Sequence, residues 1–469
     1  MNTEEAMTLH LYNSLGRAKS EFVPLNSSDV KVYVCGPTVY SDIHIGNARP
    51  IIVFDVLVRL LRYFFPHVTY VRNITDVDDK ILARAKELGE PIDVLTARTV
   101  HQFHQDIGQL GALEPDFEPR ATQHISQMVE MIRQLVDRGF AYVAEQHVMF
   151  HVPSAPDYGL LSGRSRDEMI AGARVEPAPY KKDPADFVLW KPSSNGEMGW
   201  DSPWGRGRPG WHIECSAMSV EYLGADFDIH GGGEDLIFPH HENEIAQSCC
   251  ANPNASFARV WLHNGYLQSE GAKMSKSLDN FYTVKELLGT EQRKRMWRGE
   301  AIRLMMLGTH YRKAIDFRME GLEVSKKKLD RWYRASQTFG KPSEAMPSDE
   351  FMAAVCDDLN TPLAIAVLDA MCGKILAGEE ADNDCVRKFV AGAEMLGLLQ
   401  YNFSEWFQGV SSESESGENE EIEALIRERS LAKRREDFKT ADTIRQKLEK
   451  RGVIVEDKSG GKTVWRWRT

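Results

Sequence analysis

The chain has no long apolar run. No segment approaches the ~18–20 consecutive apolar residues that a membrane-spanning helix needs, so we expect no membrane partner. The first seven residues, Met1–Met7, carry two acids and no apolar core, which is not the pattern of a secretory signal, and Met7 is a second candidate start. With 42% hydrophobic and 27% charged residues, the composition is that of an ordinary globular protein.

Cysteine is scarce, with seven among 469 residues. A sparse and odd-numbered set argues against a disulfide framework and favours a reducing compartment, so we expect a cytoplasmic protein. Cys35 and Cys215 are candidate metal ligands on grounds given below. No pattern assigns a role to the others, which are Cys249, Cys250, Cys356, Cys372 and Cys385.

Positive charge is also in deficit, because the formal net charge is −12. Nucleic-acid-binding proteins usually carry a basic surface. However, residues 421–469 contain 14 Lys/Arg against 9 Asp/Glu, so the rest of the chain carries the whole negative excess. A basic interaction surface is therefore expected only in the C-terminal tail.

A βαβ unit is predicted near the N-terminus. Val30–Val34 and Val68–Arg72 alternate and are β-branched, as strands are. Between them, apolar residues from Ile51 to Phe64 recur at helical spacing. Such a unit predicts a parallel sheet, which binds ligands beyond the carboxyl ends of its strands. Cys35 and the turn at His44 lie at such an end.

Further along, the pattern changes several times. Residues from about 80 to 140 read as helical, and residues 141–205 are rich in Pro and Gly with short strands. Phe227–His230 reads as a strand that runs into Gly231–Gly233, and Arg259–His263 as a last sheet strand. Beyond these, we expect helices over 284–399, a flexible acidic linker at Ser411–Glu420, and two helical segments around Gly452.

Two short motifs suit a nucleotide. His44-Ile45-Gly46-Asn47 stands where a strand hands over to a helix N-terminus, and backbone N–H groups there favour phosphate. Lys273-Met274-Ser275-Lys276-Ser277 suits a mobile loop that closes on a triphosphate. Alone, the first is more often a satisfied turn and the second a solvated basic loop. Their joint occurrence on a βαβ sheet favours the nucleotide site, to which the Gly231–Gly233 backbone also offers a close approach.

A metal site is the second candidate. His240 and Glu244 are four residues apart on a predicted helix, so they share one face. Zinc accepts imidazole, carboxylate and thiolate, and Cys35 and Cys215 could complete four ligands. Spacing alone does not join the two cysteines, and a polar helix face is the alternative. His241 competes with His240.

The tail is the third candidate. Its cations could contact phosphates, and Trp465 and Trp467 could stack on bases. A solvated pair of mixed-charge helices with a small Trp core is equally consistent with the pattern. The cations concerned are Arg427, Arg429, Lys433, Arg434, Arg435, Lys439, Arg445, Lys447, Lys450 and Arg451.

Taken together, the motifs resemble those of a known family. Over nearly its whole length the chain resembles bacterial cysteinyl-tRNA synthetases, which are class I aminoacyl-tRNA synthetases. One departure is Asn47, where the general class I signature has a second His. The motifs that carry the resemblance are Tyr33–Tyr40, Tyr70–Asp76, Gly210–Met218, His230–Glu244 and Lys273–Ser277.

The resemblance implies a site and a chemistry. One Zn²⁺ per chain would be held by Cys35, Cys215, His240 and Glu244 in the amino-acid pocket. Zinc binds a soft thiolate far better than a hydroxyl, which would separate L-cysteine from serine without editing. Around the cysteine backbone and ammonium, the resemblance implies contacts from Thr75, Trp211 and Asp235.

The resemblance also implies two reaction steps. The cysteine carboxylate attacks the ATP α-phosphate, with Mg²⁺ on the phosphates and His44, Lys273 and Lys276 as catalytic residues. The 3′ end of tRNA-Cys then takes the cysteinyl group, and the protein is expected to be a monomer. The implied nucleotide contacts are Thr38, His44, Gly46, Asn47, Gly231, Gly232, Gly233 and Lys276.

The fold class implied is α/β: a Rossmann-like parallel-sheet catalytic domain with an insertion, then an all-α bundle and a small C-terminal domain. The catalytic domain would have a first half at 8–118, a connective insertion at 119–205 and a second half with the zinc site at 206–265. After these we expect the Lys273 loop and a stem-contact region (266–315), a tRNA-binding helical bundle (316–409), an acidic linker (410–423) and a basic anticodon-binding domain (424–469).

Three other functions compete. A cysteine ligase of the same fold that acts on an aminosugar needs no basic tail. A non-catalytic paralogue that only binds tRNA has no use for His44, Lys273, Lys276 and four zinc ligands together. A methionyl-type synthetase is not expected to hold zinc in its amino-acid pocket. The sequence therefore favours the cysteinyl enzyme.

Overall fold

The computed structural model describes residues 7–165, 168–169, 179–194, 196–275, 278, 280–289, 297–337, 345–379, 383–408, 413–457 and 463–467. The chain forms two compact units. One comprises residues 1–322, 349–367 and 395–397, and the other comprises residues 323–348, 368–394 and 398–469. Among the described residues, no helix is long and apolar enough to cross a membrane.

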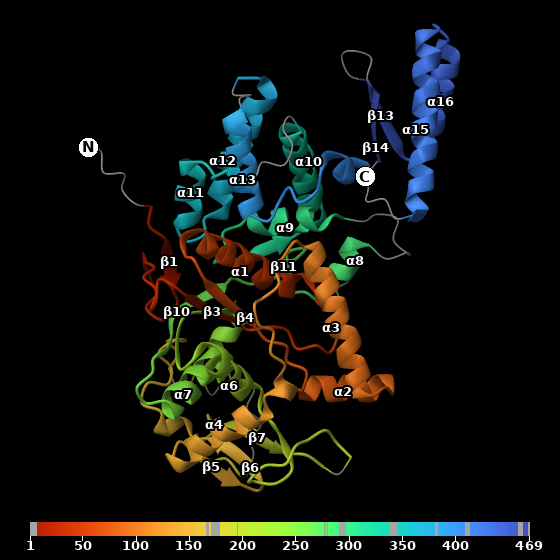
Figure 1. The fold of residues 1–469 in the computed structure, drawn as a ribbon. Helices are drawn as coiled ribbons and strands as arrows, with labels where there is room; N and C mark the ends of the chain where they lie inside the picture. The colour runs from red at the N-terminus through yellow and green to blue at the C-terminus, as the bar shows by residue number, and fades with distance from the viewer. Residues whose placement is uncertain are drawn as a thin grey trace, which may run out of the picture. The chain divides into compact units, whose positions relative to one another are not determined.

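A four-stranded parallel sheet lies at the centre of the first unit (Figure 1). Its spatial order is β10-β9-β3-β4, and helix α1 (Ile45–Phe64) connects β3 to β4, which confirms the predicted βαβ unit. From β3 the chain builds first toward β4 and later toward β9 and β10, so the strand order reverses between β3 and β9. Ligands bind at such a switch point. The strands are β3 (Val30–Val34), β4 (Val68–Arg72), β9 (Asp226–Gly233) and β10 (Phe257–Asn264).

Helices cover both faces of this sheet. A Cβ atom built on Gly231 would meet Phe54 of α1 at 2.2 Å, and one on Gly232 would meet the His241 ring at 2.9 Å. Neighbouring strand residues point to opposite faces, so α1 and the segment carrying His241 lie on opposite sides. This also corrects one expectation, because the three glycines lie inside β9 rather than after it. Glycine is needed at the first two because the helices pack so closely there.

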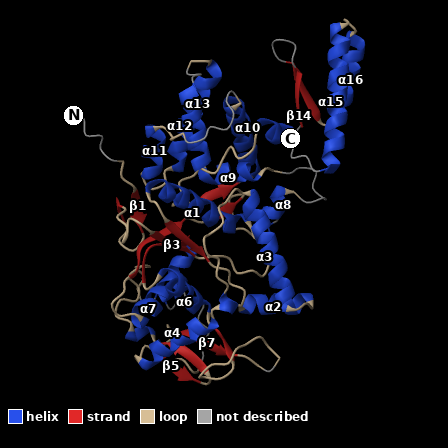
Figure 2. Ribbon diagram, in the orientation of Figure 1, coloured by secondary structure: helices blue, strands red, loops and turns tan. Residues whose placement is uncertain are grey.

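A second, antiparallel sheet is formed by the predicted insertion, in the order β5-β6-β7-β8 (Figure 2). Helix α4 (Ile125–Asp137) packs against it around a core that includes Trp190. The expected helical stretch from 80 to 140 is interrupted, because residues 111–120 form no helix. The elements concerned are α2 (Asp79–Leu88), α3 (Ile92–Gln109), η1 (Ala121–Gln123), β5 (Ala141–Ala144), β6 (His147–Phe150), η2 (Val152–Ser154), β7 (Phe187–Pro192) and β8 (Gly207–Pro209).

After the antiparallel sheet, the chain returns to the parallel sheet and then becomes largely helical. A small pair of parallel strands, β11 and β12, precedes the helices. The remaining elements of this part and the N-terminal hairpin are β1 (His10–Asn13), β2 (Ala18–Glu21), α6 (Trp211–Leu223), η3 (Glu234–Leu236), η4 (Ile237–His241), α7 (Glu242–Ala251), β11 (Leu267–Ser269), α8 (Val284–Leu288), α9 (Gly299–Leu307), β12 (Ile315–Phe317), α10 (Met319–Ser336), α11 (Asp349–Cys356), α12 (Thr361–Ala377), α13 (Asn383–Met395) and α14 (Phe403–Gln408).

The C-terminal part corrects two expectations. Helix α15 (Glu413–Arg434) begins within the predicted flexible linker, since Glu is a good helix former and acids suit a helix N-terminus. Helices α15 and α16 (Phe438–Lys450) both precede Gly452, and an antiparallel pair follows it instead of a second helix. The strands β13 (Val453–Asp457) and β14 (Thr463–Trp467) are rich in Val, Ile and Trp, which suit a pleated surface. The expected α/β class and parallel sheet are confirmed.

Candidate active site and metal centre

Four predicted zinc ligands converge at the switch point of the sheet. Cys35 follows β3 directly, and its N–H donates to the Gly231 carbonyl at 3.1 Å, which continues the ladder to β9. Cys215 comes from α6, His240 from η4 and Glu244 from α7, and their ligand atoms lie within 4.8 Å of one another. The two Sγ atoms are 3.7 Å apart. Two thiolates bound tetrahedrally to zinc at ~2.3 Å stand about 3.8 Å apart, so this spacing suits a shared ion.

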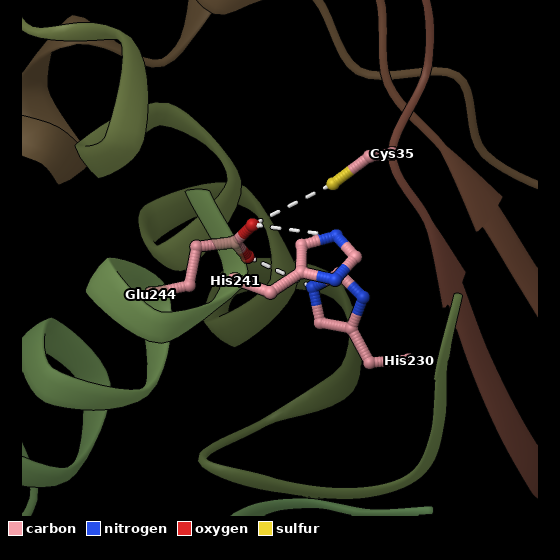
Figure 3. Close-up of side chains that lie close together, drawn as sticks. All are labelled: Cys35, His230, His241 and Glu244. Atoms are coloured by element: carbon pink, nitrogen blue, oxygen red, sulfur yellow. Dashed lines mark hydrogen bonds and ion pairs between the residues drawn. The ribbon is translucent and has the colours of Figure 1, made fainter. Parts of the chain in front are cut away.

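A second set of ligands shares two of these residues. Cys35, His230, His241 and Glu244 also have ligand atoms within 4.8 Å of one another (Figure 3). The His230 Nε2 atom lies 2.8 Å from one Glu244 oxygen, and the His241 Nε2 atom lies 4.0 Å from the other. The competition between His240 and His241 that the sequence leaves open is therefore present in the geometry as well.

A layer of histidines surrounds the ligands. His212 Nδ1 lies 2.9 Å from His240 Nδ1, and His241 Nδ1 lies 2.7 Å from His263 Nε2. Such contacts fix the ring orientation of a ligating imidazole. The buried atoms His230 Nδ1 and His241 Nε2 have no hydrogen-bond partner within the described part of the chain. Sequence reasoning missed His212, His230 and His263 as site residues, although the first two stand in motifs that it singled out.

The charges of this cluster suit a cation. Burial alone would raise the pKa of Glu244, but the neighbouring His230 and His240 lower it well below its usual value. Burial opposes the charge on His240, yet Glu244 and Cys215 raise its pKa to about 10. The hydrogen bond from Cys35 is the largest cause that lowers the pKa of Cys215 to about 6. A carboxylate and a thiolate are thus favoured at neutral pH, and a protonated His240 balances them; His240 would give up this proton on binding a metal ion.

Of the three predicted amino-acid contacts, Trp211 lies against a predicted metal ligand. The Trp211 ring stacks on the His240 ring, with centroids 4.2 Å apart, and its side chain is 37% exposed. Thr75 is buried and donates its hydroxyl hydrogen to Glu214 at 2.9 Å. Burial raises the pKa of Glu214 well above its usual value, and this buried acid was missed by sequence reasoning. Asp235 is exposed in η3, just after β9.

The His44 turn is built by local hydrogen bonds. His44 is the N-cap of α1: its Nδ1 atom accepts from the Gly46 N–H at 3.1 Å, and Asn47 Oδ1 accepts from the His44 N–H at 3.2 Å. Asn47 thus completes a capping box where the class I signature has His. Burial lowers the pKa of His44 to about 4, so the ring is neutral at pH 7. Because Nδ1 is an acceptor, the single ring proton resides on Nε2.

The two nucleotide motifs, far apart in sequence, lie together. A Cβ atom on Gly46 would meet the His44 ring at 2.9 Å and the Met274 Cε atom at 3.0 Å, so the loop approaches the turn closely at this glycine. Asn280 bonds to the backbone of the loop. Its Nδ2 atom donates to the Lys273 carbonyl at 3.3 Å, and its Oδ1 atom accepts from the Ser275 N–H at 2.8 Å. Lys276 lies outside the described residues.

Two further predicted contacts have structural surroundings of their own. Thr38 forms an isolated parallel bridge with Thr75, which extends the β3–β4 pairing toward the amino-acid contacts. A Cβ atom on Gly233 would meet Asp235 Oδ1 at 2.3 Å, so the chain turns tightly there. These positions border the switch point, and a nucleotide contact at them stays a prediction.

In the tail, one of the two tryptophans is a core residue. Trp465 is 4% exposed, and its Nε1–H donates to Glu423 at 2.7 Å. Its indole is therefore part of the small core of this region and is not presented for base stacking. The side chain of Trp467 lies outside the described residues. Among the cations, Arg429 is buried, and both of its terminal nitrogens donate hydrogen bonds to the Asp457 carboxylate, at 2.8 and 2.9 Å. The exposed cations are Arg427, Arg434, Arg435, Lys439, Arg445, Lys447 and Lys450.

Comparison with known proteins gives full-length relatives. The family model of the class I (C) tRNA synthetase catalytic domain matches residues 21–327, the DALR domain matches 350–400, and the cysteinyl-tRNA ligase anticodon binding domain matches 416–466. A cysteine–tRNA ligase of Rhodospirillum rubrum is 55% identical over 464 residues, which cover 98% of this chain and 100% of the relative. One of Paramagnetospirillum magneticum is 56% identical over 466 residues, with the same coverage.

Solved structures share the fold. Methionyl-tRNA synthetase of Mycobacterium tuberculosis in complex with methionyl-adenylate aligns with a TM-score of 0.56 at 15% identity, over 79% of this chain and 89% of that one. At this identity the likeness concerns the fold alone. It agrees with the parallel sheet and the switch point described above.

Proposed function

The chain belongs to the cysteine–tRNA ligase family and is a ligase, and from that premise we propose that it activates L-cysteine with ATP and transfers it to the 3′ end of tRNA-Cys, with zinc selecting the thiolate. The observation that carries the zinc part is the convergence of Cys35, Cys215, His240 and Glu244 at the switch point. Soft and borderline donors of this composition suit Zn²⁺ rather than Mg²⁺ or Ca²⁺.

We assign the ion to the set with two cysteines. Trp211 stacks on His240, so this set adjoins the predicted amino-acid contacts. In the other set, His241 Nδ1 lies 2.7 Å from Nε2 of the buried His263 of β10. When bound, zinc would supply a soft Lewis acid that takes the substrate sulfur as thiolate. His212 orients the His240 ring, and Glu244 supplies the negative charge that balances the ion.

The nucleotide part of the proposal rests on the His44 turn. The neutral His44 ring would donate its Nε2–H to a phosphate oxygen of ATP rather than contribute a positive charge. Positive charge would come from Lys273, Lys276 and Mg²⁺, as the resemblance implies. The packing of Met274 on Gly46 keeps the loop beside the turn, and Thr38, Asn47 and Gly231–Gly233 remain proposed nucleotide contacts.

The lowered pKa of His44 leads to a pH prediction. In the free enzyme the ring protonates only as the pH falls toward about 4, so kcat/KM for ATP should show no His44-dependent limb between pH 5.5 and 8. Because the pKa of His44 is lowered, the folded state binds fewer protons at His44 than the unfolded state does. The free energy of unfolding should therefore decrease as the pH falls from about 6.5 toward 4. Steady-state pyrophosphate exchange in wild type and His44→Gln checks this. A limb near pH 6.5 that disappears in His44→Gln would contradict a neutral His44.

The tRNA part of the proposal rests on the C-terminal region. We propose that residues 316–409 and 424–469 contact tRNA, and that the exposed cations of α15 and α16 meet its phosphates. Replacing Arg434 and Arg435 by Gln should weaken tRNA binding and reduce its salt dependence. It should leave cysteine-dependent pyrophosphate exchange unchanged. We further propose a cytoplasmic monomer.

The test of the function is acylation. Purified protein, ATP and labelled cysteine are incubated with a tRNA that bears the cysteine anticodon, and with labelled serine in a parallel tube. Cysteine ester without serine ester is the expected result. Adenylate without ester would favour transfer to a small amine such as an aminosugar. Neither product from zinc-replete protein would overturn the proposal.

A further inference from the structure

One buried arginine of helix α1 donates to five main-chain carbonyls and, within the described part of the chain, to no side chain. Arg49 is 1% exposed and lies five residues after His44. Its Nη1 atom donates to the carbonyls of Gly265 and Tyr266, at 2.6 and 2.7 Å. Its Nη2 atom donates to the carbonyls of His310, Tyr311 and Lys313, at 3.4, 3.1 and 2.5 Å. One guanidinium is therefore hydrogen-bonded to two separate chain segments, residues 265–266 and residues 310–313.

Both segments lead into the strands that hold the Lys273 loop. Gly265 and Tyr266 immediately precede β11, which turns at residues 270–271 directly into Lys273. Residues 310–313 precede β12 with one residue between, and β12 pairs with β11 in parallel. Arg49 is thus bonded to the two segments that lead into the strands of this small sheet, from which the loop emerges.

The other end of the loop is joined to the same helix directly. The Ile45 N–H donates to the Tyr282 carbonyl at 3.1 Å, and the Val284 N–H donates to the Ile43 carbonyl at 2.9 Å. These bonds flank an isolated bridge between His44 and Thr283. The segments on both sides of the Lys273 loop are therefore bonded to the start of α1: the segment before β11 through Arg49, and Tyr282 and Val284 through backbone hydrogen bonds.

Burying the Arg49 guanidinium among carbonyls costs free energy of folding, so stability alone does not explain an arginine at this position. Among the described residues, no carboxylate accepts a hydrogen bond from Arg49, so this buried cation loses hydration that carbonyl dipoles restore only in part. Burial lowers the pKa of Arg49 to about 10 although the charge of Glu234 opposes this shift, and the guanidinium stays charged at pH 7. A planar fork can hold several carbonyls in one fixed geometry, and a lysine cannot.

We propose that Arg49 is a positioning residue for adenylate formation, which holds the root of the Lys273 loop in register with the His44 turn. This rests on the proposed function. A displacement of about 1 Å at a reacting centre costs on the order of 100-fold in rate, so loosening the loop root should act on kcat. The zinc ligands and Trp211 are not bonded to Arg49, so cysteine binding should not change.

The test compares Arg49→Lys with Arg303→Lys. Arg303 is the control in the same unit: it is 0% exposed, donates to the carbonyls of Leu396, Leu110 and Gly111 and also pairs with Asp55, and none of these groups adjoins the loop. The readouts are kcat and KM of cysteine-dependent pyrophosphate exchange, zinc content, and melting temperature. For Arg49→Lys we expect kcat to fall by about 100-fold, with KM for cysteine and zinc content within about twofold of wild type. Arg303→Lys should lower the melting temperature and keep kcat.

Arg49→Gln, a neutral donor, is the second variant in case the lysine form does not fold, and the same loss of kcat is expected. Equal kcat values in the folded Arg49 and Arg303 variants would overturn the positioning role. Parallel losses of zinc, cysteine affinity and kcat in the Arg49 variants would overturn it too, because they indicate general disruption. Wild-type protein without cysteine-dependent exchange would instead overturn the proposed function, before any variant is compared.

Discussion

Cys215→Ser is expected to reduce zinc to well below one ion per chain and cysteine-dependent pyrophosphate exchange by at least about 1,000-fold, a loss of roughly 4 kcal/mol in transition-state stabilisation. Cys215 Sγ lies 3.7 Å from Cys35 Sγ in a buried site, and a neutral hydroxyl is a poor zinc ligand there. The His44 turn and the Lys273 loop contact other residues, so ATP binding should persist. Metal analysis, exchange kinetics and ATP titration measure the three effects.

Cys250→Ala is the matched control. Cys250 is also a buried cysteine, in α7, but it packs in an apolar cluster with Ala246 and Ala251. This variant should lose some stability and keep zinc and exchange activity. Normal exchange in Cys215→Ser would remove the zinc hypothesis, and zinc retained without activity would move the ion to the set that contains His230 and His241.

Asp55→Asn is expected to destabilise the first unit by about 3–5 kcal/mol, because it leaves a buried cation uncompensated. Asp55 is 2% exposed and pairs with the wholly buried Arg303. It also accepts from Arg59 Nε at 2.8 Å and from the Leu113 N–H at 2.7 Å. These groups connect α1, α9 and the chain after α3. Native-state hydrogen exchange of α1 amides measures the loss, since a chain of two units is unsuited to two-state melting.

The same carboxylate gives the sign of a pH dependence. Burial alone would raise the pKa of Asp55, but Arg303, Arg59 and the Leu113 N–H outweigh burial and lower it below its usual 3.8. A lowered pKa stabilises the folded state above about pH 3.8, and this contribution is lost as the pH falls further. Asp137→Asn is the control, because Asp137 pairs with Arg133 at 3.0 Å on an exposed helix face. We expect less than about 1 kcal/mol there, and an equal loss in the two variants would contradict the buried-pair argument.

The βαβ unit of the parallel sheet could be predicted from the local spacing of apolar and β-branched residues. The β-branched runs at Val30–Val34 and Val68–Arg72 form adjacent parallel strands, and the apolar spacing between them forms α1. Two predictions for the C-terminal region were wrong because they were based on residue composition, which does not determine backbone conformation. The acidic residues after Glu413 begin a helix, and the strands after Gly452 replace a predicted helix. Local polarity does not by itself separate a solvated helix from a linker.

From the sequence, one metal-binding and one nucleotide-binding site could be predicted as candidates, together with the residue types that would form them. Residue types marked Cys35, Cys215, His240 and Glu244 as candidate donors, with His241 as a competitor, and the resemblance joined the four into one proposed site. His44 and Lys273 were predicted as nucleotide residues because turn and loop motifs are local properties. The sequence could not determine that Met274 packs on Gly46, that His230 and His241 form a second ligand set, or that Arg49 gathers five carbonyls. These contacts depend on how strands and helices pack in three dimensions, which brings together residues as far apart in the chain as Arg49 and Lys313, 264 positions.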